Sequence, residues 1–223
     1  FSLAVYYPLA YYIGPDMEKQ QRAFVENRQR EVVGLIRTQF LKRFESSARA
    51  FEFSCETLLI KLLAWVTKHS KTDSEKSRLE RWRKRNELII EYVKEDQREL
   101  AGEDFDGEDS EDIVDQEMLD DIEELSRDEY KVDEILAEAY SDLEQIVDFL
   151  KELKKFKPAN DDKLKALTKL LKTDSVLKKH KMLIFTEYMA TARYLQKQLE
   201  EAKFTDIDEV DSATKRKRGE IIR

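Results

Sequence analysis

Apolar residues recur every three or four positions through most of residues 16 to 156, which is the spacing of amphipathic helices. From Asp16, a candidate N-cap, this spacing predicts a long helix that ends at about Ser46. A second helix, predicted from about Ser47 to Lys68, has a wide apolar face, so we expect it at the centre of the core. The apolar positions of the two helices are Phe24, Val25, Val32, Leu35, Ile36, Phe40, Leu41, Phe51, Cys55, Leu58, Leu59, Leu62, Leu63 and Val66.

The residues before the first helix have a different pattern. The stretch LAVYYPLAYYI, from Leu3 to Ile13, is rich in Tyr and apolar residues and is followed by Gly14-Pro15. Such a run predicts an extended segment or an edge strand, interrupted at Pro8 because proline cannot donate a ladder hydrogen bond.

A third helix is predicted from Asp73 or Ser74, either of which could cap it, to Leu100. Its RLERWRKR stretch is basic, and two interpretations stay open. A solvated face paired with glutamates is favoured because such pairing is routine on helix surfaces. Contact with phosphates is the alternative. The basic residues are Arg78, Arg81, Arg83, Lys84 and Arg85.

The segment from 101 to 112 is acidic and contains two glycines, which predicts a flexible loop. Asp104, Asp106 and Asp109 do not have the register of a calcium-binding loop, so we expect no metal there. A short helix is predicted near residues 113 to 125.

One more long helix is predicted from about Asp128 to Phe156, with apolar positions that alternate threes and fours. We expect it to pack on the helices of the first half, in preference to a coiled-coil homodimer. Pro158 then stops the helix, and Asn160 or Asp161 can cap the next one, so a domain boundary is predicted here.

After this boundary, helical and apolar segments alternate. The pattern predicts a helix from Asp161 to Lys172, a strand from Met182 to Thr186, a helix from Met189 to Ala202, a strand near Ile207 to Val210 and a helix from about Thr214. Such alternation is typical of an α/β unit with a parallel sheet, in which ligands gather beyond the carboxyl ends of the strands. The predicted fold class is therefore mainly α: a bundle of long helices followed by a partial α/β segment.

Composition narrows the class of protein. Charged residues make up 39% of the 223 residues, with 5 Gly and 3 Pro, which favours long helices and disfavours all-β folds. Cys55 is the single cysteine, so an intramolecular disulfide is excluded and a reducing, cytoplasmic location is predicted. No apolar run approaches the roughly 20 residues that span a bilayer, so we expect a soluble protein without a membrane partner. His69 and His180 have no companion ligands in sequence, so no zinc site is predicted.

Two blocks of sequence resemble a known family. The order DKLKALTKLL, then KMLIFTEYMATARYLQKQLE, is similar to the entry into the second RecA-like lobe of superfamily-two helicases, especially the Swi/Snf-related helicase-like ATPases. Upstream, FLKRFESS from Phe40 to Ser47 resembles a block between the two lobes in a bacterial and archaeal branch. The residues that match the motif IV region are Ile184, Phe185, Thr186, Glu187, Tyr188, Thr191, Ala192 and Leu195. Val210, Asp211 and Ser212, followed by Arg216 and Arg218, look like the next strand and basic helix.

The resemblance implies a division of the chain into three parts. Residues 1–14 would end the first lobe, 15–157 would form a helical insertion domain with the acidic loop, and 158–223 would begin the second lobe. It implies nucleic-acid contacts by Thr186, Glu187, Tyr188, Thr191, Ser212, Lys215, Arg216 and Arg218. It also implies that Lys42, Arg43, Ser46 and Ser47 form the block between the lobes.

The sequence departs from the family in its catalytic motifs. It contains no GxxxxGK[ST] phosphate loop and no DExH-type acidic quartet, and Arg223 precedes any motif V or VI. The start at Phe1 also suggests an excised fragment. We therefore expect no ATP hydrolysis, no catalytic residue and no cofactor in this fragment, whereas ATP and Mg²⁺ are expected for the parent protein.

Three classes of function are compared on these observations. The first is a non-catalytic fragment of an ATP-dependent, nucleic-acid-stimulated translocase, whose partner would be duplex DNA in preference to RNA and whose truncated lobe could self-associate. The second is a helical protein-interaction module that uses the helices or the acidic loop. The third, a stand-alone small-molecule enzyme, is disfavoured because the chain has no nucleophile arrangement, glycine-rich loop or metal cluster.

Overall fold

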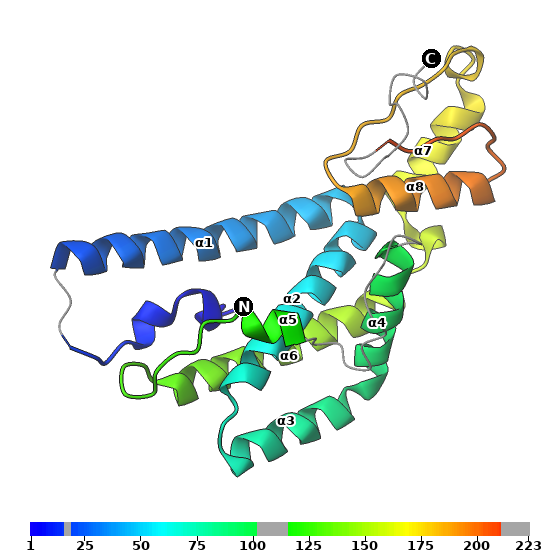
Figure 1. Ribbon diagram of the computed structural model, residues 1–223. Coiled ribbons are helices and arrows are strands. Elements are labelled where there is room, and N and C mark those ends of the chain that lie inside the picture. Colours follow the sequence, from blue (N-terminus) through cyan, green and yellow to red (C-terminus); the bar gives the residue numbers. More distant parts are fainter. Residues whose placement is uncertain (16–18, 102–115, 211–223) are drawn as a thin grey trace.

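The computed structural model describes residues 1–15, 19–101 and 116–210, and these residues fold as an assembly of helices (Figure 1). The α-helices are α1 (Lys19–Ser46), α2 (Ala48–His69), α3 (Asp73–Arg85), α4 (Glu87–Ala101), α5 (Gln116–Asp120), α6 (Val132–Leu153), α7 (Asp162–Thr173) and α8 (Met189–Glu201). Short 3-10 helices are η1 (Ala4–Tyr6), η2 (Pro8–Tyr11), η4 (Pro158–Asn160) and η5 (Leu177–Lys179). Residues 102–112 of the predicted acidic loop and the helix expected from about Thr214 lie outside the described residues.

The core is built around α2, as the sequence pattern predicts. In Figure 1, α2 runs through the middle of the molecule with α6 beside it, α1 above, α3 below and α4 on the right. Burying each leucine of this core contributes about 2 kcal/mol from the hydrophobic effect. The helix predicted from Asp128 to Phe156 is present as α6 and packs within the chain. Fully buried side chains of the two central helices are Leu59, Leu62, Leu63, Val66, Ile135, Leu143, Ile146 and Leu150.

The N-terminal segment is not an edge strand. It forms η1 and η2, and its one strand-like contact within the described residues is an isolated antiparallel bridge between Tyr12 and Tyr130. The physical reason lies at its start, where Asp142 of α6 accepts hydrogen bonds from the backbone N–H groups of Ser2 (2.7 Å) and Leu3 (2.6 Å). Leu3 then adopts a left-handed conformation with φ 58°, and a turn follows instead of a strand.

The third predicted helix is divided in two at Asn86. Its backbone N–H donates to the carbonyl groups of Trp82 and Arg83, and its side-chain Nδ2 donates to Trp82 O at 3.1 Å. Asparagine competes in this way for carbonyls that a continuous helix would use, so α3 ends and α4 begins at a new angle. Upstream, Thr72 and Glu75 form the capping box of α3, one residue before the cap that the sequence predicts.

The prediction of a parallel sheet is wrong. Within residues 1–15, 19–101 and 116–210 there is no strand, and both Met182–Thr186 and Ile207–Val210 are irregular. A strand requires a neighbour that pairs with its N–H and C=O groups. The second segment cannot supply one here, because Lys203 (φ 69°) and Asp206 (φ 58°) turn the chain away from an extended path before it.

The first of these segments is exposed as well as unpaired. Leu183 is 63% exposed and Phe185 is 87% exposed, although their sequence is as apolar as that of a buried strand. The partial α/β fold class is thereby replaced by an all-helical one for the described residues. The predicted helices on either side are present as α7 and α8.

None of the helices in the described part of the chain combines the length and the apolar content that crossing a bilayer requires.

Candidate functional site

Three hydroxyl groups meet where α1, α2 and α8 come together. Ser47 is the single residue between α1 and α2, and its Oγ accepts a hydrogen bond from the N–H of Ala50 at 3.0 Å, which caps α2. Thr191 Oγ1, in the first turn of α8, lies 2.9 Å from Ser46 Oγ and 2.8 Å from Ser47 Oγ. Ser47 and Thr191 are buried, so these hydroxyls satisfy one another in place of water.

Charged and aromatic side chains extend this contact, which we call the α1–α8 seam. The Arg43 guanidinium lies over the Tyr188 ring, 5.2 Å from its centroid, and donates through Nη1 to Ser54 Oγ at 3.0 Å. Tyr188 donates through its hydroxyl to Gln39 Oε1 at 3.4 Å. Lys163 of α7 donates to the carbonyl oxygen of Glu45. Both α7 and α8 are therefore attached to the last two turns of α1.

The seam brings together residues that the sequence placed in two separate blocks. Of the predicted inter-lobe block, Arg43, Ser46 and Ser47 lie in it, whereas Lys42 is exposed. Of the predicted nucleic-acid residues, Tyr188 and Thr191 lie in it. Thr186 is exposed and accepts from the N–H of Tyr188 at 3.3 Å, and Glu187 is exposed. Ser212, Lys215, Arg216 and Arg218 lie outside the described residues.

The hydroxyl groups of the seam hold the helices in position and are not arranged as nucleophiles. A serine or threonine becomes a nucleophile when a neighbouring base takes its proton. The hydrogen bonds of the Ser46, Ser47 and Thr191 side chains within the described residues go to one another and to the Ala50 amide, with no imidazole or carboxylate among these partners. In the same described residues, no group of three or more His, Cys, Asp or Glu side chains could hold a metal ion.

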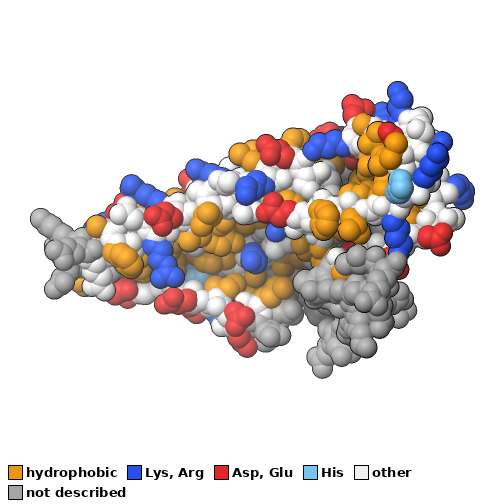
Figure 2. All heavy atoms as spheres, turned by 90° about the horizontal axis from the view of Figure 1, so that it is seen from above, with side chains coloured by type: hydrophobic (Ala, Val, Ile, Leu, Met, Phe, Trp, Pro, Cys, Tyr) orange, Lys and Arg blue, Asp and Glu red, His pale blue; other side chains and the backbone are white. Residues whose placement is uncertain are grey.

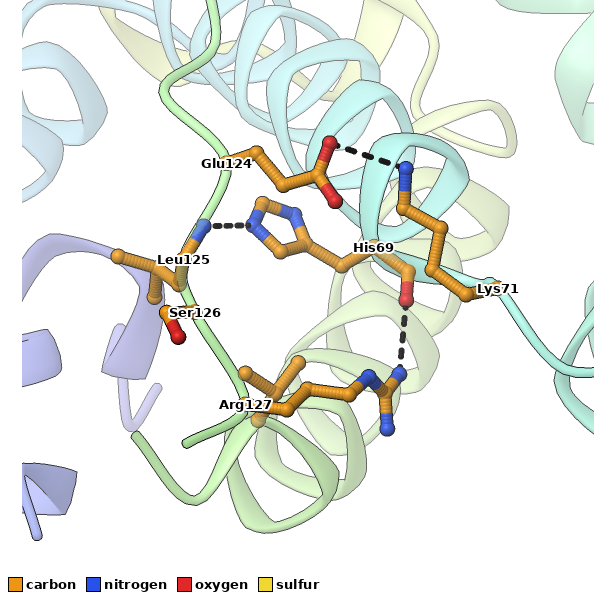
Figure 3. Close-up of a pocket in the computed structure, with 7 residues that line it drawn as sticks. His69, Lys71, Glu124, Leu125, Ser126 and Arg127 are labelled. Carbon is orange, nitrogen blue, oxygen red and sulfur yellow. Dashed lines mark hydrogen bonds and ion pairs between the residues drawn. The ribbon is translucent and has the colours of Figure 1, made fainter. Parts of the chain in front are cut away.

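A second candidate site is a pocket of about 440 Å³ at the carboxyl end of α2 (Figure 3). Its lining residues are His69, Lys71, Glu124, Leu125, Ser126, Arg127 and Val132. Figure 3 shows His69 pointing from α2 toward the chain between α5 and α6, with Lys71 and Glu124 above it and Arg127 below. Lys71 Nζ lies 3.0 Å from Glu124 Oε2.

His69 lies at the centre of this pocket, although no possible partner residue lies near it in the sequence. It is only 2% exposed and stacks on Trp65, with ring centroids 3.8 Å apart. Burial lowers the pKa of His69, although the Trp65 carbonyl and Glu124 act in the opposite direction. The helical spacing of Trp65 and His69 could have suggested their contact, but no sequence signal indicates the bond to Leu125.

A third candidate site is a cluster of polar side chains buried between α2 and α4. Arg49 Nη1 lies 2.8 Å from Glu52 Oε2 and its other terminal nitrogen bonds Asp96. Gln97 Nε2 donates to Glu56 Oε2 at 2.8 Å. Burial, followed by the neighbouring Asp96 carboxylate, raises the pKa of Glu56 to about 8. This cluster was not predicted, although Glu52 and Glu56 interrupt the apolar face of α2 at helical spacing and could have marked it.

No known protein family, no curated protein and no solved structure matches the chain. The geometry and charge of the described residues, together with the sequence resemblance, therefore carry the functional proposal.

Replacing Thr191 by Val should loosen α8 from the seam. Valine keeps the volume but leaves the Ser46 and Ser47 hydroxyls without their shared partner, which costs about 1 kcal/mol. We expect amide protons of α8 to exchange about fivefold faster, as measured by hydrogen exchange. Thr38→Val is the matched control because the Thr38 hydroxyl bonds only its own helix, at Gly34 O. Equal protection of α8 in both variants would argue against a positioning role for Thr191.

Proposed function

We propose that this chain is a non-catalytic helical part of an ATP-driven translocase that acts on duplex nucleic acid, and that it couples α1 to a nucleic-acid-contacting unit that includes α7 and α8. One observation supports the proposal above the others: the two blocks that resemble Swi/Snf-related ATPases, separated by about 140 residues in sequence, meet at the α1–α8 seam. A chance resemblance of two short blocks gives no reason for them to touch.

The charge at this end of the molecule fits an anionic partner. Between 161 and 181 the chain has seven lysines and three aspartates, in a protein whose formal net charge is −8. Figure 2 shows Lys and Arg side chains gathered at the same end of the molecule. Lysines bind phosphates without reading base sequence, which suits a motor that moves along nucleic acid. The exposed lysines are Lys163, Lys165, Lys169, Lys172, Lys178, Lys179 and Lys181.

The proposed task is mechanical. Force generated by ATP hydrolysis elsewhere in the parent protein would reach α1, and the seam would pass it to α7 and α8 through the Arg43, Ser46 and Ser47 contacts. This needs well-fixed contacts and no nucleophile, and the hydroxyl cluster described above meets both conditions.

The test measures binding of the chain to a short DNA duplex of arbitrary sequence by fluorescence anisotropy, at a series of salt concentrations. We expect weak binding at about 50 mM salt that is lost steeply as salt rises. Replacing Lys169, Lys178 and Lys179 by Gln should weaken binding about tenfold or more and reduce the slope of log affinity against log salt by about 2 to 3.

The matched control replaces three exposed lysines away from α7, namely Lys61, Lys76 and Lys84, by Gln. It removes the same total charge, so an equal loss of affinity in both variants would mean that net charge, and not the α7 end, drives binding. Absence of any binding at about 50 mM salt would contradict the nucleic-acid assignment for this chain.

A second candidate, a helical protein-interaction module, is favoured by one observation. Leu183 and Phe185, which are 63% and 87% exposed, form part of a run of four exposed apolar residues. Exposed apolar runs of this kind occur at protein contacts. If the chain is stably folded and does not bind DNA, the protein-interaction function would be favoured over the nucleic-acid function.

A further inference from the structure

The chain between α5 and α6 ties three parts of the molecule together. We call residues 124–131 the strap. Its Leu125 N–H donates to His69 Nε2 at 3.1 Å, and its Arg127 Nη2 donates to the carbonyl oxygen of His69 at 3.0 Å and lies 2.8 Å from Glu75 Oε1 at the start of α3. The strap therefore holds the end of α2 and the beginning of α3.

The same strap also holds the N-terminal segment. The carbonyl oxygen of Glu129 accepts from the N–H groups of Ile13 (2.7 Å) and Gly14 (3.2 Å), and Lys131 N–H donates to Tyr11 O at 2.9 Å. In Figure 1 the strap lies beside the N-terminal segment along this edge of the molecule. Whatever loosens the strap at His69 would loosen the segment that leads into α1.

The hydrogen bonds at His69 fix its protonation state. The Trp65 carbonyl, 2.9 Å from Nδ1, can only accept, so Nδ1 carries the proton. Nε2 must then be the lone-pair nitrogen, because the Leu125 N–H can only donate. Both bonds are satisfied by the neutral ring alone. A proton added from water to Nε2 would face the Leu125 N–H and break that bond.

We propose that His69 and the strap form an acid-released latch, in which the neutral imidazole holds the strap closed and a proton on Nε2 releases it, together with residues 11–14 of the N-terminal segment. The latch is independent of the nucleic-acid proposal, since it involves neither the seam nor α7.

The groups that face His69 bias the latch in known directions. Glu124 on the strap favours the protonated ring, whereas Lys71, between α2 and α3, and Arg127 on the strap oppose it. Glu75 on α3 and Asp133 on α6, which lies 2.6 Å from Arg127 Nη1, hold the Arg127 charge in place. Desolvation is the largest effect and favours the neutral ring.

The direction of the pH response follows from this balance. Because the folded-state pKa of His69 is depressed, the closed strap has its full stability above the ordinary histidine value of 6.5 and loses it as pH falls below that value. Opening at low pH is thus favoured by proton uptake. Acid-driven release by histidine is a known principle of pH sensing.

The experiment measures amide protection factors of Leu125 and Ile13 by NMR-detected hydrogen exchange at pH 7.5 and pH 5.5. In the unmodified chain we expect both to fall by up to about tenfold at the lower pH, which is the limit for one histidine with an ordinary pKa of 6.5. In His69→Gln, the amide oxygen can still accept from Leu125 but cannot titrate, so protection should be the same at both values. His180→Gln, at an exposed position, is the matched control and should keep the full response.

Three outcomes would overturn the latch. Protection of Leu125 that stays constant in the unmodified chain while His69 titrates is the first, and a pH response that survives His69→Gln is the second. If that variant does not fold, the ring nitrogens of the unmodified chain give an independent answer through long-range ¹H–¹⁵N NMR correlations. A proton on Nε2 at pH 7.5 would contradict the bonding that the latch requires.

Discussion

The free energy of unfolding should fall by about 4 kcal/mol between pH 5 and pH 9, because Glu56 must ionise in the core. Its side chain is fully buried, and its raised pKa of about 8 compares with an ordinary value near 4.5. A group whose pKa rises on folding stabilises the protein fully below the ordinary value and loses that contribution as pH passes the folded value. Urea unfolding at several pH values measures the effect.

Glu56→Gln is the informative variant. Glutamine is neutral at every pH and can donate to Asp96 as the protonated carboxyl does, so the variant should have a nearly flat profile and exceed the unmodified chain in stability at pH 9. Glu80→Gln on the exposed face of α3 removes the same charge and should preserve the original profile. Parallel profiles for the unmodified chain and Glu56→Gln would assign the pH dependence to other groups.

Asp142→Asn should destabilise the chain by about 2 to 4 kcal/mol. Both carboxylate oxygens accept from backbone N–H groups, of Ser2 and Leu3, and the side chain is fully buried. Asparagine would place an NH₂ group against one of these donors and remove the charge that strengthens both bonds. The measurements are urea unfolding and the exchange rate of the Leu3 amide.

The control for this variant lies on the same helix. Asp148→Asn removes an exposed carboxylate whose partner is Lys151, at 3.4 Å, and should change stability by about 0.5 kcal/mol or less. If Asp142→Asn costs no more than Asp148→Asn, the N-terminal segment is held by its apolar contacts and not by the carboxylate.

Helix positions were predictable because apolar periodicity is a local signal. The predicted helices from Ser47, Asp161 and Met189 agree with α2, α7 and α8 to within about two residues, since each has either a capping residue or a break at its start. The division at Asn86 was not predicted because a buried asparagine in a basic stretch looks like any surface residue in sequence. Its effect depends on which carbonyls it reaches.

The sheet was predicted incorrectly for a general reason. A continuous apolar run such as Met182 to Phe185 is typical of a buried strand, but it does not indicate whether a partner strand exists. Pairing is a long-range property, and the positive φ angles at Lys203 and Asp206 that prevent it here have no reliable signature in sequence.

The candidate sites divide in the same way. The resemblance identified Arg43, Ser46, Ser47, Tyr188 and Thr191 as candidate site residues. It did not indicate that they are in contact. The bonds of His69 to Leu125 and of Gln97 to Glu56 join residues 56 and 41 positions apart, and helix periodicity contains no information about such pairs. The burial of His69 was likewise not predicted.

The one-residue junction at Ser47 has a mechanical consequence. Helix α1 has 28 residues and is therefore about 42 Å long, so a rotation at Ser47 would move its far end through a long arm. A rotation of about 10° at that point would displace the far tip by about 7 Å. Rearranging two or three hydroxyl bonds at one end would thus be amplified into a displacement larger than a helical turn at the other.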